Sequence, residues 1–337
     1  MRIESSVTSI SWIPSEAVRG MTRLPFDMGV AHYDEPPPEV VHADDLEDLR
    51  VADRFRFANQ LRAWIDVEDG RIVDCGYSGG GHIGATTIQL GRRRMTFAAV
   101  SLPDRQQPPH IEGTSVRFVQ TAGGRTGAPA PRRVKYPPFV QLAAPLAWTT
   151  LSLTLNVDGT ATHQCTGASP FPRHWIYDGA GTLVQKTGLI DFKGWYTRAF
   201  GKHTPWGDQD SETLVTEVES ALERELSREI MDGEVAIRKL GKGDTLVIEG
   251  DEGAEMFLLL DGVLDVEVGG KPVTSVGPGA VLGERSGIEG GRRTATLRAL
   301  TLCKVAVVAA DRLQPDALST LATQHRREDK PGRVGAT

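Results

Sequence analysis

Apolar and polar residues alternate along much of residues 1–209, which is the pattern of strands that are buried on one face. The stretch WTTLSLTLNVDGTATHQC shows this alternation on both sides of Asp158-Gly159, a pair typical of a tight hairpin turn. RAWIDVEDGRIVDCGY repeats the arrangement around Asp69-Gly70. The sequence therefore predicts a mainly β protein whose first region, residues 1–209, is an antiparallel β barrel or sandwich built from hairpins.

The spacing of apolar residues changes after residue 209. In DSETLVTEVESALERELSREI, residues 210–230, they recur at steps of three and four, as on one face of a helix: Val215, Val218, Leu222, Leu226 and Ile230. Asp210 is a suitable N-cap, and Glu212 favours the positive end of a helix. We therefore expect a connecting helix over residues 210–232.

Short apolar stretches separated by glycine turns follow the predicted helix. VAIRKLGKGDTLVIEGDEGAEMFLLLDGVLDVEVGGKPVTSVGPGAVLGE has such turns at Gly-Lys-Gly-Asp, Gly-Asp-Glu-Gly, Gly-Gly and Gly-Pro-Gly. Turns this regular predict a compact C-terminal roll of short strands, within a domain that spans residues 233–327. DRLQPDALSTLATQHRRE allows one short terminal helix, and we expect residues 328–337 to form a disordered tail.

Two glycine-rich stretches interrupt the first region. TAGGRTGAPAPRRVKYPP, residues 121–138, is predicted to be a long surface loop. CGYSGGGHIG, residues 75–84, fits both the G-x-S-x-G elbow and the G-x-G-x-x-G pattern, and each of these requires a helix directly afterwards. Because ATTIQLG follows and its threonines and isoleucine favour a strand, we prefer a flexible glycine hairpin to catalysis at Ser78.

Charge and cysteine usage limit the partners. The chain has 38 Lys and Arg against 44 Asp and Glu, a net charge of -6, so no general attraction to nucleic acid is expected and a basic patch would have to be local. Cys75, Cys165 and Cys303 stand singly, which suits a reducing compartment. The start MRIESSVTSISWIP lacks a signal-peptide pattern, and no apolar run is long enough to span a bilayer. We expect a cytoplasmic protein without a membrane partner.

GERSGIEGGRRTAT, residues 283–296, lies between strand-like stretches and contains almost nothing apolar. Backbone amides of such a glycine-rich stretch can form a concave nest for an anion, and Arg293 can add a bidentate, always-charged contact to a phosphate. Glu284 would repel that phosphate but can accept a hydrogen bond from a sugar hydroxyl. A ligand with one compact phosphate and a free ribose hydroxyl satisfies both groups.

This stretch resembles the phosphate-binding cassette of the cyclic nucleotide-binding domain family, in which Gly-Glu, a short helix, and Arg followed by a small residue and Ala stand at the same spacing. The resemblance covers roughly residues 233–327 and implies a β-roll with a cyclic nucleotide as its ligand and no cofactor. It implies that Glu284 accepts the ribose 2′-OH and that Arg293 binds the cyclic phosphate, with the amides of Gly283, Ser286 and Ala295 completing the cradle. The ligand-binding residues implied are Leu282, Gly283, Glu284, Arg285, Ser286, Arg293, Thr294 and Ala295.

The identity of the nucleotide depends on Thr294, which follows the arginine. A threonine there resembles the channels of the family that prefer cyclic GMP, whereas bacterial activators more often carry serine and bind cyclic AMP. We prefer cyclic AMP to cyclic GMP, because one hydroxyl is both donor and acceptor and discriminates poorly. The chain departs from the family at Arg285 and Gly287, where members usually carry apolar residues, so a scaffold protein with a degenerate site stays an alternative.

Residues 169–208 gather aromatic and charged side chains that could line a pocket in the first region. The group is Arg173, His174, Trp175, Tyr177, Asp191, Trp195, His203 and Trp206. We prefer core packing and an interdomain surface, since large rings fill the places where strands close. His163 and His174 lack the spacing of metal ligands.

The predicted function is a cyclic nucleotide-binding regulatory protein whose roll signals to an N-terminal effector or interaction domain. We expect cyclic nucleotide as the ligand and a homo-oligomer or protein partner through the N-terminal domain. No nucleic acid partner is expected, because no recognition helix fits after the roll. The alternative is a nucleotide-regulated enzyme or small-molecule binder with its site in residues 1–209, which would require His174, Asp178 and Asp191 to converge on one cavity.

Overall fold

The protein forms two compact units that alternate along the chain. The computed structural model describes residues 1–14, 24, 28, 33–42, 45–90, 93–126, 130–133, 137, 140–188, 195, 204–206, 215–231, 235–288, 291–313 and 315–324. Unit 1 comprises Met1–Gln185 and Ile190–Thr213, and unit 2 comprises Lys186–Leu189 and Leu214–Thr337. The sequence-based boundary at residue 209 lies close to the last crossing, but the sequence did not indicate that residues 186–189 belong with the C-terminal part. The expected tail, residues 328–337, lies outside the described residues.

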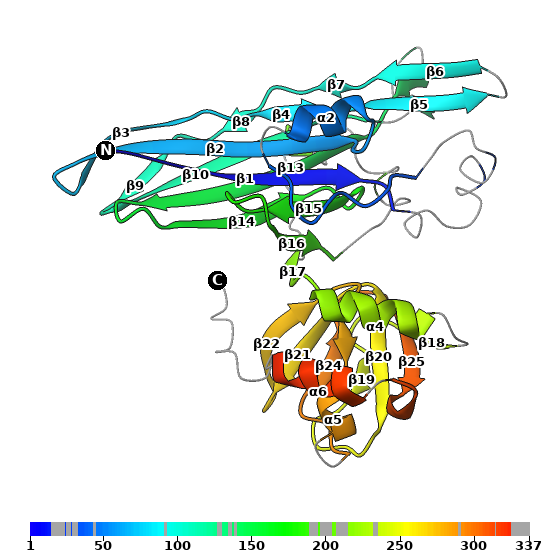
Figure 1. The fold of residues 1–337 in the computed structure, drawn as a ribbon. Helices are drawn as coiled ribbons and strands as arrows, with labels where there is room; N and C mark the ends of the chain where they lie inside the picture. Colours follow the sequence, from blue (N-terminus) through cyan, green and yellow to red (C-terminus); the bar gives the residue numbers. More distant parts are fainter. Residues whose placement is uncertain are drawn as a thin grey trace. The chain divides into compact units, whose positions relative to one another are not determined.

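Unit 1 contains two antiparallel sheets packed face to face (Figure 1). One has the strand order β16 (Leu183–Thr187), β15 (Arg173–Tyr177), β1 (Arg2–Trp12), β2 (Phe57–Glu68), β3 (Arg71–Tyr77), with β4 (Gly81–Ile83) also paired to β2. The other has the order β14 (Ala161–Ala168), β13 (Leu146–Asn156), β10 (Ser115–Arg125), β7 (Val100–Ser101), with β8 (Arg105–Gln106) and β9 (His110–Glu112) beside β10. The predicted antiparallel β architecture is confirmed.

Both predicted hairpins are present in unit 1. Asp69 and Gly70 join β2 to β3 with φ values of 48° and 72°, the left-handed conformation that a two-residue hairpin turn requires. Gly159, with φ 86°, lies in the turn between β13 and β14. The rest of the unit adds a helix, α2 (Asp45–Val51), and two short hairpins, β5 (Ala85–Leu90) with β6 (Arg93–Ala98) and β11 (Ala130–Arg133) with β12 (Val140–Ala143).

The prediction of a long loop over residues 121–138 was wrong for its described residues. Strand β10 continues to Arg125, and Ala130–Arg133 form strand β11. The glycines were interpreted as turn residues, but Gly123 pairs with Trp148 of β13, and a Cβ there would meet the Ala147 carbonyl oxygen and lie 2.7 Å from the Trp148 Cβ. Glycine at this position therefore permits a close approach of strands.

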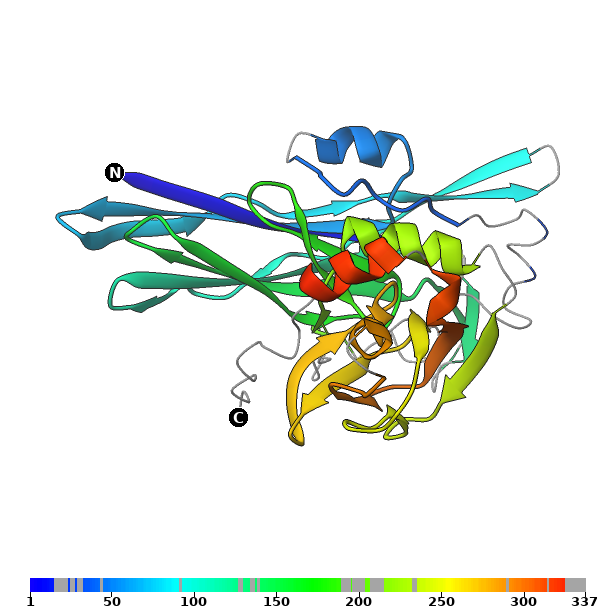
Figure 2. The ribbon, with the colours of Figure 1, turned by 60° about the horizontal axis from the view of Figure 1, so that its bottom comes forward.

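Unit 2 is a β-roll covered by two helices. One sheet has the order β18 (Ala236–Leu240), β25 (Cys303–Ala309), β20 (Glu255–Asp261), β23 (Val281–Leu282), and the other has β19 (Thr245–Val247), β24 (Thr296–Ala299), β21 (Leu264–Val268), β22 (Lys271–Val276). Phe257, Leu264 and Val305 belong to the apolar core of the roll. A second core lies under α4 (Ala221–Met231) and α6 (Pro315–Gln324), which run across one side of the roll (Figure 2). The predicted roll and short terminal helix are confirmed.

The predicted connecting helix starts later than expected. Residues 210–214 lie outside the described part of the chain, and Val215–Thr216 form strand β17, paired with Lys186 and Thr187. The β-branched side chains of this segment favour a strand. Helix α4 begins at Ala221, directly after Ser220, which caps it. The three- and four-residue spacing of apolar residues was therefore continuous across two different elements.

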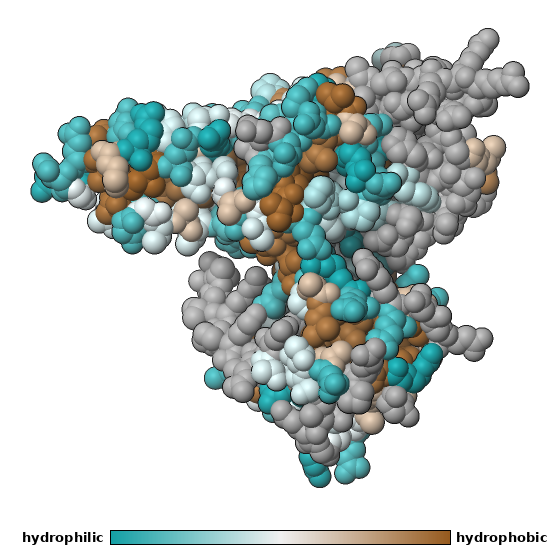
Figure 3. Space-filling view, viewed as in Figure 1, coloured by the Kyte–Doolittle hydropathy of each residue, from teal (hydrophilic) through white to brown (hydrophobic). Residues whose placement is uncertain are grey.

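Large exposed apolar side chains are scattered in both units. Val51, Val73 and Ile111 of unit 1 and Leu302 of unit 2 are each more than half exposed. On the face drawn in Figure 3, hydrophobic residues form small patches among hydrophilic ones. Among the described residues, no helix combines the length and the apolar character needed to cross a bilayer.

Candidate functional site

An open pocket of about 410 Å³ lies in unit 2, at the end of strand β23. It is lined by Val247, Val266, Leu282, Gly283, Glu284, Ser286, Arg293, Thr294, Ala295 and Leu297. The pocket thus brings together every residue of the predicted site except Arg285, which is not among its lining.

The segment that forms the pocket is a strand, a tight turn, a short helix and a return loop. Gly283 follows β23 with φ 88°, a left-handed conformation that favours glycine. Helix α5 (Glu284–Ile288) comes next, and Ser286 within it donates a hydrogen bond to the Gly283 carbonyl oxygen at 3.0 Å. The predicted cassette helix therefore forms although Arg285 and Gly287 replace the expected apolar residues.

Arg293 is the buried cation of the pocket, with 5% of its surface exposed. Its Nη1 donates to the main-chain oxygen of Glu255 at 2.8 Å and to the Ser286 hydroxyl at 2.9 Å. Its Cζ lies 5.1 Å from the centroid of the Phe257 ring, within reach of a cation–π contact. Burial lowers the pKa of Arg293, the Glu255 carboxylate opposes this shift, and Arg238 adds to it. A guanidinium stays charged in proteins, so the pocket holds a permanent positive charge.

Main-chain bonds fix the position of Arg293. Its N–H donates to the Asp251 carbonyl oxygen at 2.8 Å, and its own carbonyl oxygen accepts from the Gly250 N–H at 2.8 Å. A Cβ on Gly253 would lie 2.6 Å from the Arg293 Nη2, so the absent side chain leaves room for the guanidinium. The turn between β19 and β20 thus holds the arginine from outside the cassette.

Sequence reasoning missed Gly253, Glu255 and Phe257 as supports of this arginine. Gly253 was interpreted as one of many turn glycines, and Glu255 contributes only a main-chain oxygen, which no sequence pattern reveals. The lining also includes an acidic residue, Glu284, with only 5% of its surface exposed, and an apolar wall of Val247, Val266 and Leu297. A buried cation, an acidic acceptor and an apolar wall suit a ligand with a phosphate, a hydroxyl and a flat ring.

His174 in unit 1 is fully buried. Its Nε2 faces the Ser169 carbonyl oxygen at 2.9 Å and must carry the proton, so Nδ1 accepts from the Ser11 hydroxyl at 2.6 Å. Burial lowers the pKa of His174 to about 4, against the opposing effect of the Ser169 hydrogen bond, so the ring is neutral at pH 7. Asp178 accepts hydrogen bonds from the N–H groups of Ala180 and Thr182 in its own turn. Asp191 lies outside the described residues.

The aromatic residues of unit 1 pack against one another, as the core-packing interpretation expected. The Phe171 and Trp195 rings are 4.9 Å apart, and the Trp195 indole N–H donates to the Leu146 carbonyl oxygen at 2.6 Å. Trp12 and Trp175 form an edge-to-face pair at 5.2 Å. His203 lies outside the described residues. No group of three metal-ligating side chains occurs in the part of the chain that the structure describes.

The glycine stretch at residues 75–84 is not a nucleophile elbow. Ser78 is exposed, its hydroxyl donates to the Glu4 carboxylate at 3.2 Å, and strands β4 and β5 follow it in place of a helix. Gly79 and Gly84 lie where a Cβ would meet the carbonyl oxygens of Gln60 and Phe55. The glycines therefore allow the chain to lie close to β2.

The roll, the segment from Gly283 to Ala295 and the pocket all belong to unit 2. Residues 237–315 match the model of the cyclic nucleotide-binding domain family, so unit 2 contains a cyclic nucleotide-binding domain. That match leaves residues 1–236 uncovered.

Solved structures similar to this chain include the following three. The N-terminal domain of a transcriptional regulator from Streptomyces coelicolor A3(2) is 27% identical, over 33% of this chain and 83% of that chain, with a TM-score of 0.25. A cyclic nucleotide-binding domain from Methylobacillus flagellatus KT is 29% identical, over 27% of this chain and 51% of that chain, with a TM-score of 0.22. A putative cyclic nucleotide-binding protein from Geobacter metallireducens GS-15 is 24% identical, over 30% and 78% of the two chains, with a TM-score of 0.25.

Proposed function

We propose that the protein is a cyclic nucleotide-dependent regulator that binds its ligand in the pocket of unit 2 and signals to unit 1. The observation that carries this proposal is the buried Arg293 guanidinium in a pocket that also contains Glu284, within a domain that matches the cyclic nucleotide-binding family. A buried, always-charged arginine favours a phosphate over a neutral ligand.

Each group in the pocket has one role in this proposal. Arg293 binds the cyclic phosphate, which competes with the Ser286 hydroxyl and the Glu255 carbonyl oxygen for its N–H donors. Glu284 accepts the ribose 2′-OH, and backbone amides at Gly283, Ser286 and Ala295 complete the cradle. Leu282 and the apolar wall pack against the nucleoside. Arg285 follows Glu284 on α5, outside the pocket lining, and has no assigned contact with the ligand.

We prefer cyclic AMP to cyclic GMP. Thr294 lines the pocket and its hydroxyl can serve either purine. Beyond that hydroxyl, the wall of Val247, Val266 and Leu297 offers no side-chain polar group to pair with the extra amino and oxo groups of guanine.

The output belongs to unit 1, as an effector or as a surface for a homo-oligomer or protein partner. A regulatory role is preferred to an enzyme because His174 is a buried, neutral, fully hydrogen-bonded residue. The free thiols of Cys75, Cys165 and Cys303 support a reducing, cytoplasmic location.

Calorimetry of the full-length protein with cyclic AMP, cyclic GMP and 5′-AMP tests this proposal. We expect cyclic AMP to bind with a Kd of about 1 µM or tighter, and cyclic GMP more weakly. Arg293→Ala should abolish the binding. Arg292→Ala is the matched control, because Arg292 is the adjacent, exposed arginine and its nearest carboxylate, Glu252, is 4.0 Å away.

The absence of heat with either cyclic nucleotide at millimolar concentration would favour the scaffold alternative with a degenerate site. Equal binding by Arg293→Ala and the unchanged protein would show that the ligand lies elsewhere. Equal affinity for 5′-AMP would contradict recognition of a cyclic phosphate.

A further inference from the structure

The chain that enters α4 lies along the chain that enters the cassette. Thr216 of β17 packs on Gly277. A Cβ added to Gly277 would meet the Thr216 hydroxyl oxygen and lie 2.9 Å from the Thr216 Cβ. Glu217 pairs with Val276 in a parallel bridge, and its carboxylate accepts from the Thr274 hydroxyl at 3.0 Å. The segment before α4 and the segment before β23 therefore run parallel, side by side. Strand β23 ends at Leu282, two residues before Glu284.

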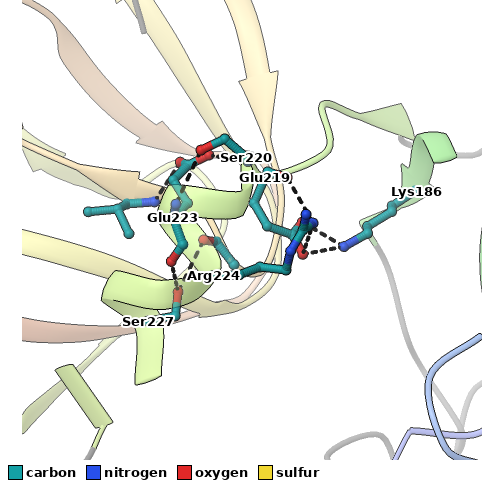
Figure 4. A network of polar contacts seen from close by, with 8 residues as sticks. Lys186, Glu219, Ser220, Glu223, Arg224 and Ser227 are labelled. Carbon is teal, nitrogen blue, oxygen red and sulfur yellow. Dashed lines mark hydrogen bonds and ion pairs between the residues drawn. The ribbon is translucent and has the colours of Figure 1, made fainter. Parts of the chain in front are cut away.

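Glu223 joins the start of α4 to β23. Its Oε2 accepts from the Ser220 N–H at 2.8 Å, while the Ser220 hydroxyl accepts from the Glu223 N–H at 3.1 Å, a reciprocal capping box (Figure 4). Its Oε1 accepts from the Val281 N–H at 3.0 Å. Glu223 is fully buried, so one carboxylate fixes both the first turn of α4 and the strand that leads into the cassette.

Glu219 joins the same helix start to strand β16. Its carboxylate oxygens lie 2.5 and 2.6 Å from Lys186 Nζ, and both side chains are at least 90% buried (Figure 4). Arg224 donates to the Glu219 carbonyl oxygen at 3.1 Å and lies 3.8 Å from its carboxylate. A Cβ on Gly279 would lie 3.0 Å from the Glu219 Cδ, so this carboxylate also rests on the turn before β23.

Strand β16 is continuous with unit 1. Its first three residues, Leu183–Gln185, belong to unit 1, and Lys186 and Thr187 belong to unit 2. A change in the Lys186–Glu219 pair therefore acts on a strand whose other end is built into a sheet of unit 1.

We propose that the first turn of α4 is the coupling element between the nucleotide pocket and unit 1. Glu223 is its positioning residue at the cassette, and the Lys186–Glu219 ion pair is its contact with β16. Nucleotide capture moves the strand before Gly283, Glu223 transmits the movement to α4, and Glu219 changes its hold on Lys186. This proposal rests on the proposed function and specifies how nucleotide binding in the pocket is transmitted to unit 1. Such coupling requires that the nucleotide binds one conformation of the first turn of α4 more tightly than the other, and that the Lys186–Glu219 contact differs between the same two conformations.

Hydrogen exchange measured by mass spectrometry on the full chain tests the coupling, with calorimetry on the same samples to confirm nucleotide occupancy. In the unchanged protein, saturating cyclic AMP should change the exchange rate of residues 183–188 by about fivefold or more, the lower end of ordinary allosteric coupling. Lys186→Met removes the charge and keeps the chain length, and it should bind nucleotide but lose this change. Lys186→Arg keeps the charge and should retain it.

Arg298→Met is the matched control. It removes the ion pair between Arg298 and Glu267 of unit 2, whose atoms are 2.9 Å apart. This ion pair is not one of the contacts that join α4 to β23 or to β16. It should leave the nucleotide-dependent change at residues 183–188 intact. A purely structural role for Lys186 would lower the melting temperature of Lys186→Met without removing the change. That result would overturn the proposal.

The outcomes separate the two proposals. Nucleotide binding without any change at residues 183–188 in the unchanged protein contradicts the coupling and leaves the proposed function standing. No nucleotide binding contradicts both. If Lys186→Met does not fold, Glu219→Gln replaces it, because the amide keeps an acceptor for Lys186 but removes the negative charge. A nucleotide-dependent change at residues 183–188 that persists in Glu219→Gln would also overturn the proposal.

Discussion

The Arg293 guanidinium and the Ser286 hydroxyl are hydrogen-bonded at 2.9 Å, across the loop that separates them by seven residues. Ser286 also donates to the Gly283 carbonyl oxygen, so the hydroxyl links the arginine to the turn before α5. The cassette is thus already closed by its own side chains around the place where the phosphate is expected. In the proposed function, binding therefore requires an exchange of hydrogen-bond partners at Arg293.

Ser286→Ala tests this exchange. The free energy of unfolding should fall by about 1 kcal/mol, the usual value for one hydrogen bond. A phosphate supplies new acceptors to Arg293, so nucleotide affinity should stay equal or increase. Urea denaturation and calorimetry measure the two effects. Ser319→Ala, at an exposed position in α6, should change neither, and a tenfold loss of affinity in Ser286→Ala would show that the hydroxyl binds the ligand itself.

Glu223→Ala should destabilise unit 2 by about 2–4 kcal/mol, because the buried N–H of Val281 and the partly buried N–H of Ser220 lose their carboxylate acceptor. Glu225→Ala, at an exposed position of the same helix, should change the free energy of unfolding by less than about 0.5 kcal/mol. Thermal and urea unfolding give both values. Equal effects of the two substitutions would mean that the Glu223 bonds contribute little to stability.

Gly279→Ala should be more destabilising than Gly243→Ala. Both glycines have left-handed backbones, with φ values of 99° and 91°, so each substitution costs about 1–3 kcal/mol in backbone strain. Only at Gly279 would the new Cβ crowd Glu219, whereas nothing lies within 4 Å at Gly243. The difference between the two variants in urea denaturation should be about 1 kcal/mol or more, the cost of overpacking. No difference would place Glu219 away from the turn.

His174 should make the stability of unit 1 depend on pH. Its pKa is about 4 in the folded protein and 6.5 in the unfolded chain, so only the unfolded chain binds this proton between those values. The free energy of unfolding is therefore unaffected by this proton above pH 6.5 and falls as the pH decreases from 6.5 to about 4. The total loss is about 3 kcal/mol. Urea denaturation at pH 7 and pH 5 should show the loss.

His174→Gln should flatten this pH dependence, since glutamine keeps a donor for the Ser169 carbonyl oxygen but does not titrate. His110→Gln, at an exposed histidine, should leave the pH dependence as it is. A steep loss of stability toward pH 5 that survives in His174→Gln would assign the effect to other groups.

The sequence predicted the parts of the site that are close together along the chain. Glu284 and Arg293 belong to one short segment, and the family resemblance carried by that segment implied the cassette. Gly253, Glu255 and Phe257 support the same arginine from a different strand and turn, and the contact of Arg293 with Glu255 uses a main-chain atom. Such partners depend on how β20 packs beside the cassette, which no local pattern contains.

The start of α4 shows a second limit. Val215 and Val218 fit the apolar spacing of the helix, yet Val215 lies in β17 because Lys186 and Thr187, about thirty residues earlier, provide a strand to pair with. The decisive local signal was the Ser220 and Glu223 capping box, which marks the true helix start. The predicted hairpins at Asp69-Gly70 and Asp158-Gly159 succeeded because each turn is decided by two adjacent residues.

The chain crosses between the two units three times, at residues 185–186, 189–190 and 213–214. A fragment that starts at Leu214 would contain the cassette and both sheets of the roll but would separate Glu219 from Lys186. Unit 2 therefore includes Lys186 and Thr187 from the middle of the chain, which pair with Glu219 and with β17. A transplant that keeps these contacts has to carry Lys186 and Thr187, the two residues of β16 that belong to unit 2.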